Sequence, residues 1–247
     1  MRVAVAGGTG LVGSHTVDAL VRHGHEPVVL ARSRGIDLTT GRGLYEAMAG
    51  VEAVVDVSNV ATLDRSKALE FFEAETKHLL EAGARGSVRH HVLLSIVGVD
   101  LVHTGYYAGK VRQEELVRSG PVPYTILRAT QFHEFAQQLL GRGRGPVGLI
   151  PRMRVQPVAA AEVGEKLAGL AVGTPAGGTV EMAGPEVLEL VPLARRVAAR
   201  TGHPRFVLPV PVPGAAGKAM REGALLPTGP ATIGRTTFDE WIAQARF

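Results

Sequence analysis

Tyr106 and Lys110 stand four residues apart in the stretch HTGYYAGKVRQEE. On a helix this spacing puts both side chains on one face, one turn apart. A neighbouring ammonium lowers the pKa of a phenol, which makes the phenol a better proton donor. Because the chain holds only four tyrosines and five lysines, chance predicts roughly 0.08 such pairs. We therefore interpret the pair as a proton-transfer device rather than as two ordinary surface residues.

A glycine-rich stretch, GGTGLVG, lies between an apolar β-like run at 2–7 and a helical pattern at 11–24. Glycines at this place let the backbone turn tightly and approach a pyrophosphate, which the positive end of the following helix attracts. The alternative is a turn that only packs helix on strand. We predict a dinucleotide site, whose contacts in this turn are Gly7, Thr9, Gly10, Leu11, Val12 and Gly13.

The end of the second expected strand carries the sequence ARSRG instead of a carboxylate. An acidic residue there would hydrogen-bond the ribose of NAD, whereas the guanidinium of Arg32 suits a phosphate and an adenine face. This favours NADP(H), with Ser33 beside Arg32. Asp37 is interpreted as a partner for the adenine amino group, with an ordinary turn residue as the alternative.

The elements that must position these residues alternate along the first 130 residues. Strands are predicted at 2–7, 26–33, 51–59, 90–96 and 123–129, and helices at 11–24, 41–50, 64–86 and 106–119. Such alternation implies right-handed βαβ crossovers. The predicted fold class is therefore α/β, a Rossmann-type doubly wound parallel sheet.

After residue 140 the alternation of strands and helices becomes less regular. Residues 141–157 are rich in glycine, proline and arginine and indicate a connecting segment or a short-stranded lobe. A helix is expected at 159–172, a strand at 177–184 and a helix at 188–202, while PVPVPG (209–214) cannot be a central strand. We expect an NADP-binding core at 1–140 and a small, discontinuous substrate lobe at 141–247 with elements that return to the core sheet.

Together these residues resemble the short-chain dehydrogenase/reductase superfamily, in its atypical NmrA-like branch of NAD(P)-binding proteins. The resemblance runs to about residue 140 and more weakly through 156–167. The residues that carry it are Gly7, Gly10, Gly13, Arg32, DVSN (56–59), Ser95 in LLSIVGV, Tyr106, Lys110 and TILRATQFHEF (125–135). It implies a Rossmann core, NADP(H) binding, and hydride transfer in the active members.

The resemblance also implies roles for individual residues. Ser95 would polarise a substrate oxygen, Tyr106 would be the general acid, and Lys110 would tune the tyrosine and hold the nicotinamide ribose. Further cofactor contacts would come from Ser58, Asn59, Ala129, Thr130, Gln131 and Phe132. His133 is interpreted as an ordinary imidazole on a helix surface, and the arginines at 142, 144, 152 and 154 as solvated loop charges.

Composition narrows the class of protein. Hydrophobic residues make up 45% and charged residues 20%, the net charge is +4, and there is no cysteine. Disulfides and thiolate metal sites are thereby excluded, and no other metal-ligand spacing, nucleic-acid motif, targeting segment or membrane-length apolar run is seen. We expect a cytoplasmic protein, a monomer or small homo-oligomer, whose partner is a small-molecule substrate.

The predicted activity is an NADPH-dependent oxidoreductase acting on a small carbonyl, quinone or enone-like molecule, with the hydride supplied by the cofactor. A non-catalytic NADP-binding redox sensor that regulates a protein partner is the alternative from another class. A sugar-type epimerase or dehydratase is the lesser alternative within the enzymes, because the chain is short for a nucleotide-sugar lobe.

Overall fold

The structure is a computed structural model that describes residues 1–86, 88–102, 105–143 and 145–247. The chain divides into two compact units, each made of several segments. The first unit comprises Met1–Ser95, His103–Arg128 and Ala161–Val180. The second comprises Ile96–Val102, Ala129–Ala160 and Glu181–Phe247.

A seven-stranded sheet in the order β11-β8-β5-β4-β3-β1-β2 runs through the chain. Its strands are β1 (Arg2–Ala6), β2 (Glu26–Leu30), β3 (Ala53–Asp56), β4 (His90–Ile96), β5 (Tyr124–Ala129), β8 (Thr179–Ala183) and β11 (Thr232–Ile233). The pairs β1–β2, β1–β3, β3–β4 and β8–β11 are parallel. The predicted α/β fold of Rossmann type is confirmed.

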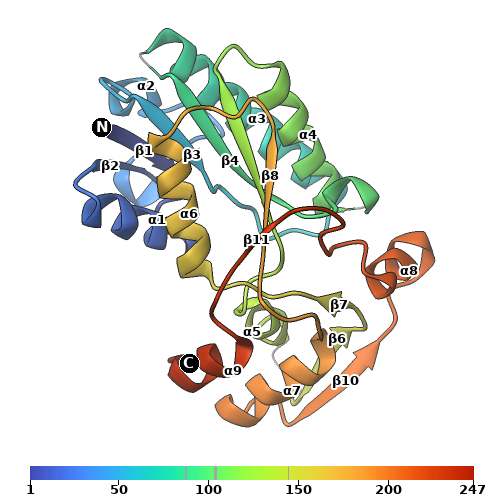
Figure 1. Cartoon of the computed structure of the whole chain (residues 1–247). Helices are drawn as coiled ribbons and strands as arrows, with labels where there is room; N and C mark the ends of the chain where they lie inside the picture. The colour runs from blue at the N-terminus through green and yellow to red at the C-terminus, as the bar shows by residue number, and fades with distance from the viewer. Residues whose placement is uncertain (87, 103–104, 144) are drawn as a thin grey trace. The chain divides into compact units, whose positions relative to one another are not determined.

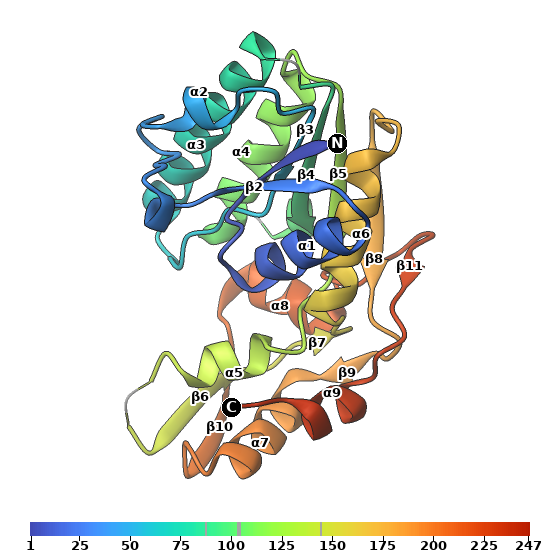
Figure 2. The ribbon, with the colours of Figure 1, turned by 90° about the vertical axis from the view of Figure 1, so that its left-hand side faces the viewer.

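Helices cover both faces of the sheet in the first unit. They are α1 (Leu11–Arg22), α2 (Leu44–Ala47), α3 (Arg65–Arg85), α4 (Tyr106–Ser119) and α6 (Ala160–Val172). Helices α3 and α4 lie side by side on one face, and α1 and α6 lie on the other (Figures 1 and 2). Leu30, Leu44, Val54 and Leu79 belong to one buried apolar cluster that joins the sheet to α2 and α3.

Small residues let the helices approach one another closely. A Cβ on Gly109 of α4 would lie 2.7 Å from the Phe72 ring and 2.8 Å from the Ala68 carbonyl oxygen, both on α3. On the other face, a Cβ on Gly164 of α6 would lie 2.7 Å from the His15 Cβ of α1. Neither distance is compatible with a side chain, so both contacts require glycine.

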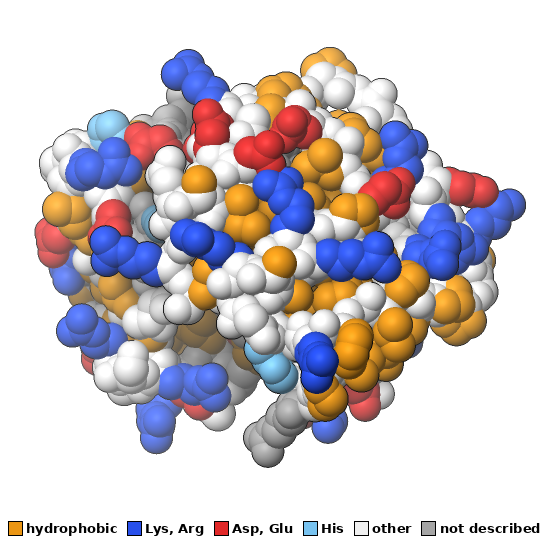
Figure 3. Space-filling model, turned by 90° about the horizontal axis from the view of Figure 1, so that it is seen from below, with side chains coloured by type: hydrophobic (Ala, Val, Ile, Leu, Met, Phe, Trp, Pro, Cys, Tyr) orange, Lys and Arg blue, Asp and Glu red, His pale blue; other side chains and the backbone are white. Residues whose placement is uncertain are grey.

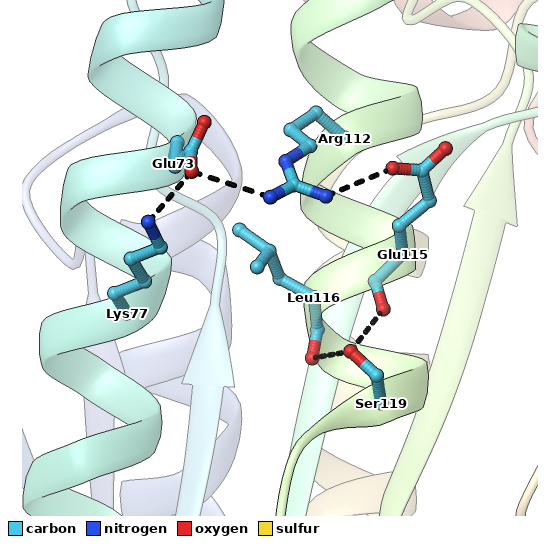
Figure 4. A network of polar contacts seen from close by, with 6 residues as sticks. All are labelled: Glu73, Lys77, Arg112, Glu115, Leu116 and Ser119. Atoms are coloured by element: carbon cyan, nitrogen blue, oxygen red, sulfur yellow. Dashed lines mark hydrogen bonds and ion pairs between the residues drawn. The ribbon is translucent and has the colours of Figure 1, made fainter.

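The solvent side of α3 and α4 is joined by charged residues (Figure 4). Arg112 contacts Glu73 across the helix pair at 3.2 Å and Glu115 on its own helix at 3.2 Å, and Lys77 contacts Glu73 at 2.6 Å. The hydrogen bonds from Lys77 and Arg112 lower the pKa of Glu73 to about 2. Such exposed pairs contribute little individually, so the helix contact depends chiefly on the packing at Gly109.

The second unit contains short elements. They are α5 (Phe135–Leu140), β6 (Val147–Pro151), β7 (Arg154–Val155), β9 (Leu188–Glu189), α7 (Leu190–Thr201), β10 (Phe206–Val210), α8 (Gly214–Glu222) and α9 (Phe238–Gln244). Strands β6 and β10 form a parallel pair, and β7 and β9 an antiparallel pair. The glycine- and proline-rich segment 141–157 thus contains the short strands β6 and β7. The proline-rich run 209–214 begins in β10, a strand of a two-stranded sheet.

The structure corrects several sequence-based boundaries, among them the third strand, expected at 51–59 and observed at Ala53–Asp56. The second strand ends at Leu30 rather than at residue 33, because Arg32–Arg34 form a 3-10 turn that Gly35 closes with φ +80°. The helix expected at 41–50 is limited to Leu44–Ala47, since the positive φ angles of Gly43 and Gly50 interrupt the backbone on either side.

The surface drawn in Figure 3 carries lysine and arginine side chains spread among apolar ones. Leu149 of β6 and Leu208 of β10, paired in register, are both exposed. Among the residues that the structure describes, no helix is long and apolar enough to cross a bilayer.

Candidate functional site

The glycine turn follows β1 in the first unit. Gly7 has φ +77°, a conformation that favours glycine, and its amide donates to the Leu30 carbonyl of β2 at 3.1 Å. A Cβ on Gly7 would lie 2.9 Å from the Val57 carbonyl oxygen and 3.0 Å from the Ser58 Cα. The turn is therefore held directly against the residues that follow β3.

Helix α1 starts within this turn, with Gly10 as its N-cap. A Cβ on Gly13 would lie 2.2 Å from the Gly7 carbonyl oxygen, so the first turn of the helix folds back onto the glycine turn. Gly10 has φ −82°, and a Cβ on it would lie 3.2 Å from the Gly7 carbonyl oxygen, with Thr9 exposed beside it and Val12 buried. This glycine turn at a helix N-terminus fits a pyrophosphate, which would meet the unpaired N–H groups of Leu11, Val12 and Gly13.

The loop after β2 places Arg32 and Ser33 in the 3-10 turn, and both side chains are exposed. Asp37 lies beyond them, where its Oδ1 accepts hydrogen bonds from the Thr39 amide at 3.0 Å and the Thr39 hydroxyl at 2.7 Å. The hydroxyl bond is the main cause that lowers the pKa of Asp37. Arg32 is free to reach an anionic ligand, while one oxygen of Asp37 is used within its own loop.

The residues after β3 connect the glycine turn to α4. Asp56 ends the strand fully buried, and its Oδ1 accepts from the Ser58 amide at 3.0 Å. Ser58 is buried, and its hydroxyl has no hydrogen-bond partner among the described residues. Asn59 is exposed, and its Oδ1 accepts a 2.8 Å hydrogen bond from the Tyr106 hydroxyl.

Tyr106 begins α4, directly after Gly105, whose φ of +53° turns the chain into the helix. Its ring packs edge-on against Phe72 of α3, with centroids 5.6 Å apart. Burial raises the pKa of Tyr106, and the neighbouring Tyr107 and Glu75 act in the same direction. The sequence-based expectation of a lowered pKa is wrong for the chain by itself, because burial of the phenol is the largest cause of its pKa shift and raises it.

Lys110 is almost fully buried. Its Nζ donates to the Leu94 carbonyl of β4 at 2.7 Å and to the Gln113 Oε1 at 2.5 Å, and it lies 4.8 Å from the centre of the Phe72 ring. Tyr106 and Lys110 thus share Phe72 as a neighbour. Ser95 of β4 is also buried, and within the described part of the chain its Oγ has no hydrogen-bond partner.

Two carboxyl groups near Lys110, those of Asp56 and Glu75, are fully buried. The Gln113 amide nitrogen donates to the Asp56 Oδ2 at 2.9 Å and to the Glu75 Oε1 at 2.8 Å. Burial, followed by the charge of Asp56, raises the pKa of Glu75 well above its usual range. Burial lowers the pKa of Lys110, against the opposing charges of Asp56, Glu75 and Glu114. Gln113 thus links Lys110 to both buried carboxyl groups.

The residues after β5 belong to the second unit. Thr130 is buried, and its amide and hydroxyl bond the carbonyl oxygens of Met182 and Gln156 at 3.0 and 2.5 Å. The Gln131 Oε1 accepts from the Gln156 amide at 3.4 Å, Phe132 pairs with Val158, and the Ala129 carbonyl accepts from Val97. These contacts fix the backbone after β5 within its own unit.

His133 is buried, so its interpretation as a surface imidazole is wrong. Its Nε2 lies 3.0 Å from the Thr236 carbonyl oxygen, and its ring stacks on Trp241 at 5.7 Å and meets Phe238 at 5.8 Å. His133 is a core residue against which α9 packs. Arg142, Arg152 and Arg154 are exposed as expected, and Arg144 lies outside the described residues.

Sequence reasoning missed Phe72, Glu75 and Gln113 as parts of the site. The available signal was helical spacing. Glu75 and Thr76 interrupt the buried stripe formed by Phe72 and Leu79 on α3, and Gln113 follows Lys110 by three residues. A carboxyl group inside an apolar stripe indicates a buried polar partner on another element.

A family model described as NAD(P)H-binding matches residues 7–165. The chain belongs to this NAD(P)H-binding family, and the predicted membership of an NAD(P)-binding family is confirmed. No curated protein matches the chain by sequence.

Solved structures share the fold at low sequence identity. A short-chain dehydrogenase/reductase superfamily protein from Agrobacterium tumefaciens with bound NAD is 20% identical, with a TM-score of 0.71 over 99% of this chain and 95% of that one. An NADPH-dependent quinone oxidoreductase from Escherichia coli, complexed with NADPH, is 17% identical, with a TM-score of 0.71 over 98% of both chains. A UDP-glucose 4-epimerase from Thermus thermophilus, in complex with NAD, is 19% identical, with a TM-score of 0.68 over 98% and 92%.

Proposed function

We propose that the protein is an NADPH-dependent oxidoreductase that transfers a hydride to or from a small carbonyl, quinone or enone-like substrate. The observation that carries the proposal is a chain of contacts in the first unit. The glycine turn packs on Val57 and Ser58, and the next residue, Asn59, accepts a hydrogen bond from the Tyr106 hydroxyl. These contacts support a site in which the proposed phosphate-binding turn and the candidate proton donor lie at one edge of the sheet.

The proposed cofactor contacts are divided between several elements. The turn at 7–13 would hold the pyrophosphate, Arg32 and Ser33 the 2′-phosphate, and Asp37 the adenine. Ser58 and Asn59, which follow β3 in the same unit, would contact the nicotinamide end. The bound cofactor would supply the hydride.

The protein's own residues would handle the substrate oxygen and its proton. Ser95 offers an unpartnered buried hydroxyl, which would donate to that oxygen once a substrate reaches it. Tyr106 keeps its proton at neutral pH because its pKa is raised, so it would be present as a donor. Lys110 would stabilise the charge that remains on Tyr106 after the proton leaves.

One observation favours a second candidate, a non-catalytic NADP-binding sensor. Lys110 is buried and hydrogen-bonded within the protein, where a sensor would need it only as a structural cation. The two functions differ in turnover and not in cofactor binding.

The test follows the absorbance of NADPH in the presence of a panel of quinones, ketones and enones, with calorimetric titration of NADPH and NADH beside it. Oxidation of NADPH that depends on the added substrate supports the reductase. Tight binding of NADPH without turnover of any panel member supports the sensor. Exchange of epimeric UDP-sugars in the presence of NAD, without net oxidation of a cofactor, would replace both with an epimerase.

A further inference from the structure

Gln113 lies one helical turn beyond Lys110 on α4 and connects three charged or ionisable side chains from three elements. Its amide oxygen accepts from the Lys110 Nζ at 2.5 Å. Its amide nitrogen donates to the Asp56 Oδ2 at the end of β3, at 2.9 Å, and to the Glu75 Oε1 of α3, at 2.8 Å. Gln113, Asp56 and Glu75 have no exposed surface at all.

A primary amide can satisfy these contacts in only one orientation. The nitrogen has two N–H donors, and each meets one carboxyl oxygen, while the oxygen has only acceptor lone pairs. If the amide turned over, its oxygen would face the two carboxyl groups and its nitrogen would face the ammonium. Asp56 and Glu75 therefore fix the orientation of Gln113, and the oriented oxygen fixes Lys110.

A buried ammonium requires such partners. Without them the desolvation of the charge would disfavour this position of the side chain, and Lys110 would extend toward water. The Leu94 carbonyl and the Phe72 ring supply two further contacts, at 2.7 and 4.8 Å. Among these three partners in the described part of the chain, Gln113 is the one whose orientation is determined by hydrogen bonds to other side chains.

We propose that Gln113 is a positioning residue, oriented by Asp56 and Glu75, that determines where Lys110 presents its ammonium relative to Tyr106. This inference rests on the proposed function, in which Lys110 assists turnover. Gln113 itself touches neither substrate nor cofactor in the proposal. Its effect reaches the reaction through Lys110.

The first experiment reads the position of Lys110 without any turnover. Full-length protein is acetylated with an N-hydroxysuccinimide ester, and mass spectrometry follows each lysine with time. Lys67, Lys77, Lys166 and Lys218 serve as controls within the same molecule. In the wild type Lys110 should react more slowly than these four. In Gln113→Met its rate should rise by roughly tenfold or more, while the other four rates stay unchanged.

The matched control is Arg112→Met, the same replacement at the next residue. It breaks the surface contacts to Glu73 and Glu115 (Figure 4) but leaves the contacts of Lys110 with Leu94, Gln113 and Phe72 in place. Acetylation of Lys110 should be the same in this variant as in the wild type. A milder variant, Gln113→Asn, keeps the amide but shortens its reach, and it replaces Gln113→Met if circular dichroism shows that the latter does not fold.

The second experiment measures kcat and KM of the same variants against pH with a substrate found in the panel. A positioning role predicts that Gln113→Met lowers kcat by roughly tenfold or more and displaces a limb of its pH profile, with KM changed much less. Arg112→Met should keep the wild-type profile. A merely structural role would lower the amount of active protein without moving the profile.

The inference is overturned if a folded Gln113 variant leaves Lys110 as slowly acetylated as in the wild type and keeps the wild-type kcat profile. A wild type without any turnover would instead refute the proposed function. In that case the acetylation rates alone decide whether Gln113 positions Lys110.

Discussion

The hydroxyl of Tyr106 is the atom whose removal tests the proposed proton transfer most directly. Tyr106→Phe keeps the ring against Phe72 and loses only the hydrogen bond to Asn59. We expect turnover to fall by about 10²–10⁴-fold, the usual contribution of a general acid, with NADPH affinity retained. Steady-state kinetics and calorimetric titration measure the two quantities.

Tyr107→Phe is the control for this prediction. The next residue of the helix points about 100° away, and burial alone raises the pKa of Tyr107 to about 12. Its turnover should stay near that of the wild type. Full turnover in Tyr106→Phe would show that the proton comes from another group.

Arg32 tests the choice of cofactor. The side chain is exposed at the start of the turn after β2, where a guanidinium can pair with a 2′-phosphate. Calorimetry should show that NADPH binds roughly tenfold or more tightly than NADH, a difference of about 1.4 kcal/mol. Arg32→Asp should reverse the order, and Arg34→Asp in the same turn should reverse it less. Equal affinities for the two cofactors in the wild type would refute this assignment.

The side chains around Lys110 show which site residues can be predicted from the sequence and which cannot. Tyr106, Lys110 and Ser95 could be selected because their types suit proton transfer. Gln113 and Glu75 could not be assigned the same way, because their role comes from contacts across 57 and 38 residues of chain. The direction of the Tyr106 pKa was also missed, since spacing along a helix does not reveal the burial of the phenol.

The contact between the glycine turn and the start of α1 leaves no room for a methyl group at Gly13. A Cβ there would lie 2.2 Å from the Gly7 carbonyl oxygen and 2.7 Å from the Gly8 Cα, both backbone atoms. We expect Gly13→Ala to lower the free energy of unfolding by about 1–3 kcal/mol and to weaken NADPH binding. Denaturant unfolding and titration measure these effects.

Gly169→Ala provides the comparison for that change. Gly169 lies in α6 with nothing within 4 Å of its Cβ position, so alanine should stabilise the helix by up to about 1 kcal/mol. NADPH affinity should not change. If Gly13→Ala behaved like Gly169→Ala, the turn would have more freedom than these distances allow.

Elements with strong local signals were predicted well. Strand β4 and helix α4 occupy the residues expected for them, and α3 begins after Asp64, whose carboxyl oxygen accepts from the amides of Ser66 and Lys67. Helices α5, α8 and α9 were not predicted. They are short, and helices of that length are stabilised mainly by tertiary contacts, such as those that His133 makes with Phe238 and Trp241.

Glu75 gives the stability of the protein a characteristic dependence on pH. Its pKa is raised in the folded state above the unfolded value near 4.5, so the folded state binds the proton more tightly. The resulting stabilisation is fully present below the unfolded pKa and is lost as the pH rises through the folded pKa. Between pH 5 and 9 the wild type should therefore lose stability relative to Glu75→Gln, which cannot ionise, by at most about 1.4 kcal/mol per pH unit.

Chemical denaturation of both proteins across this pH range measures the difference. The comparison cancels the contributions of ionisable groups that do not interact with Glu75, because both proteins share them. A difference in the free energy of unfolding that is constant with pH would mean that Glu75 is ionised in the folded protein throughout.

The discontinuous make-up of the first unit has a consequence for the order in which a ribosome delivers its parts. Helix α6 covers α1 through the close approach of Gly164 to His15, and Glu165 pairs with Arg22 at 2.7 Å, yet residues 129–160 of the other unit are synthesised before this helix is complete. About 150 residues separate the end of α1 from the end of α6, so at about 5–20 residues per second α1 waits roughly 8–30 s for its cover. During that interval the nascent chain presents the apolar face of α1 to water or to a chaperone, and a pause in translation between residues 140 and 180 would prolong that exposure.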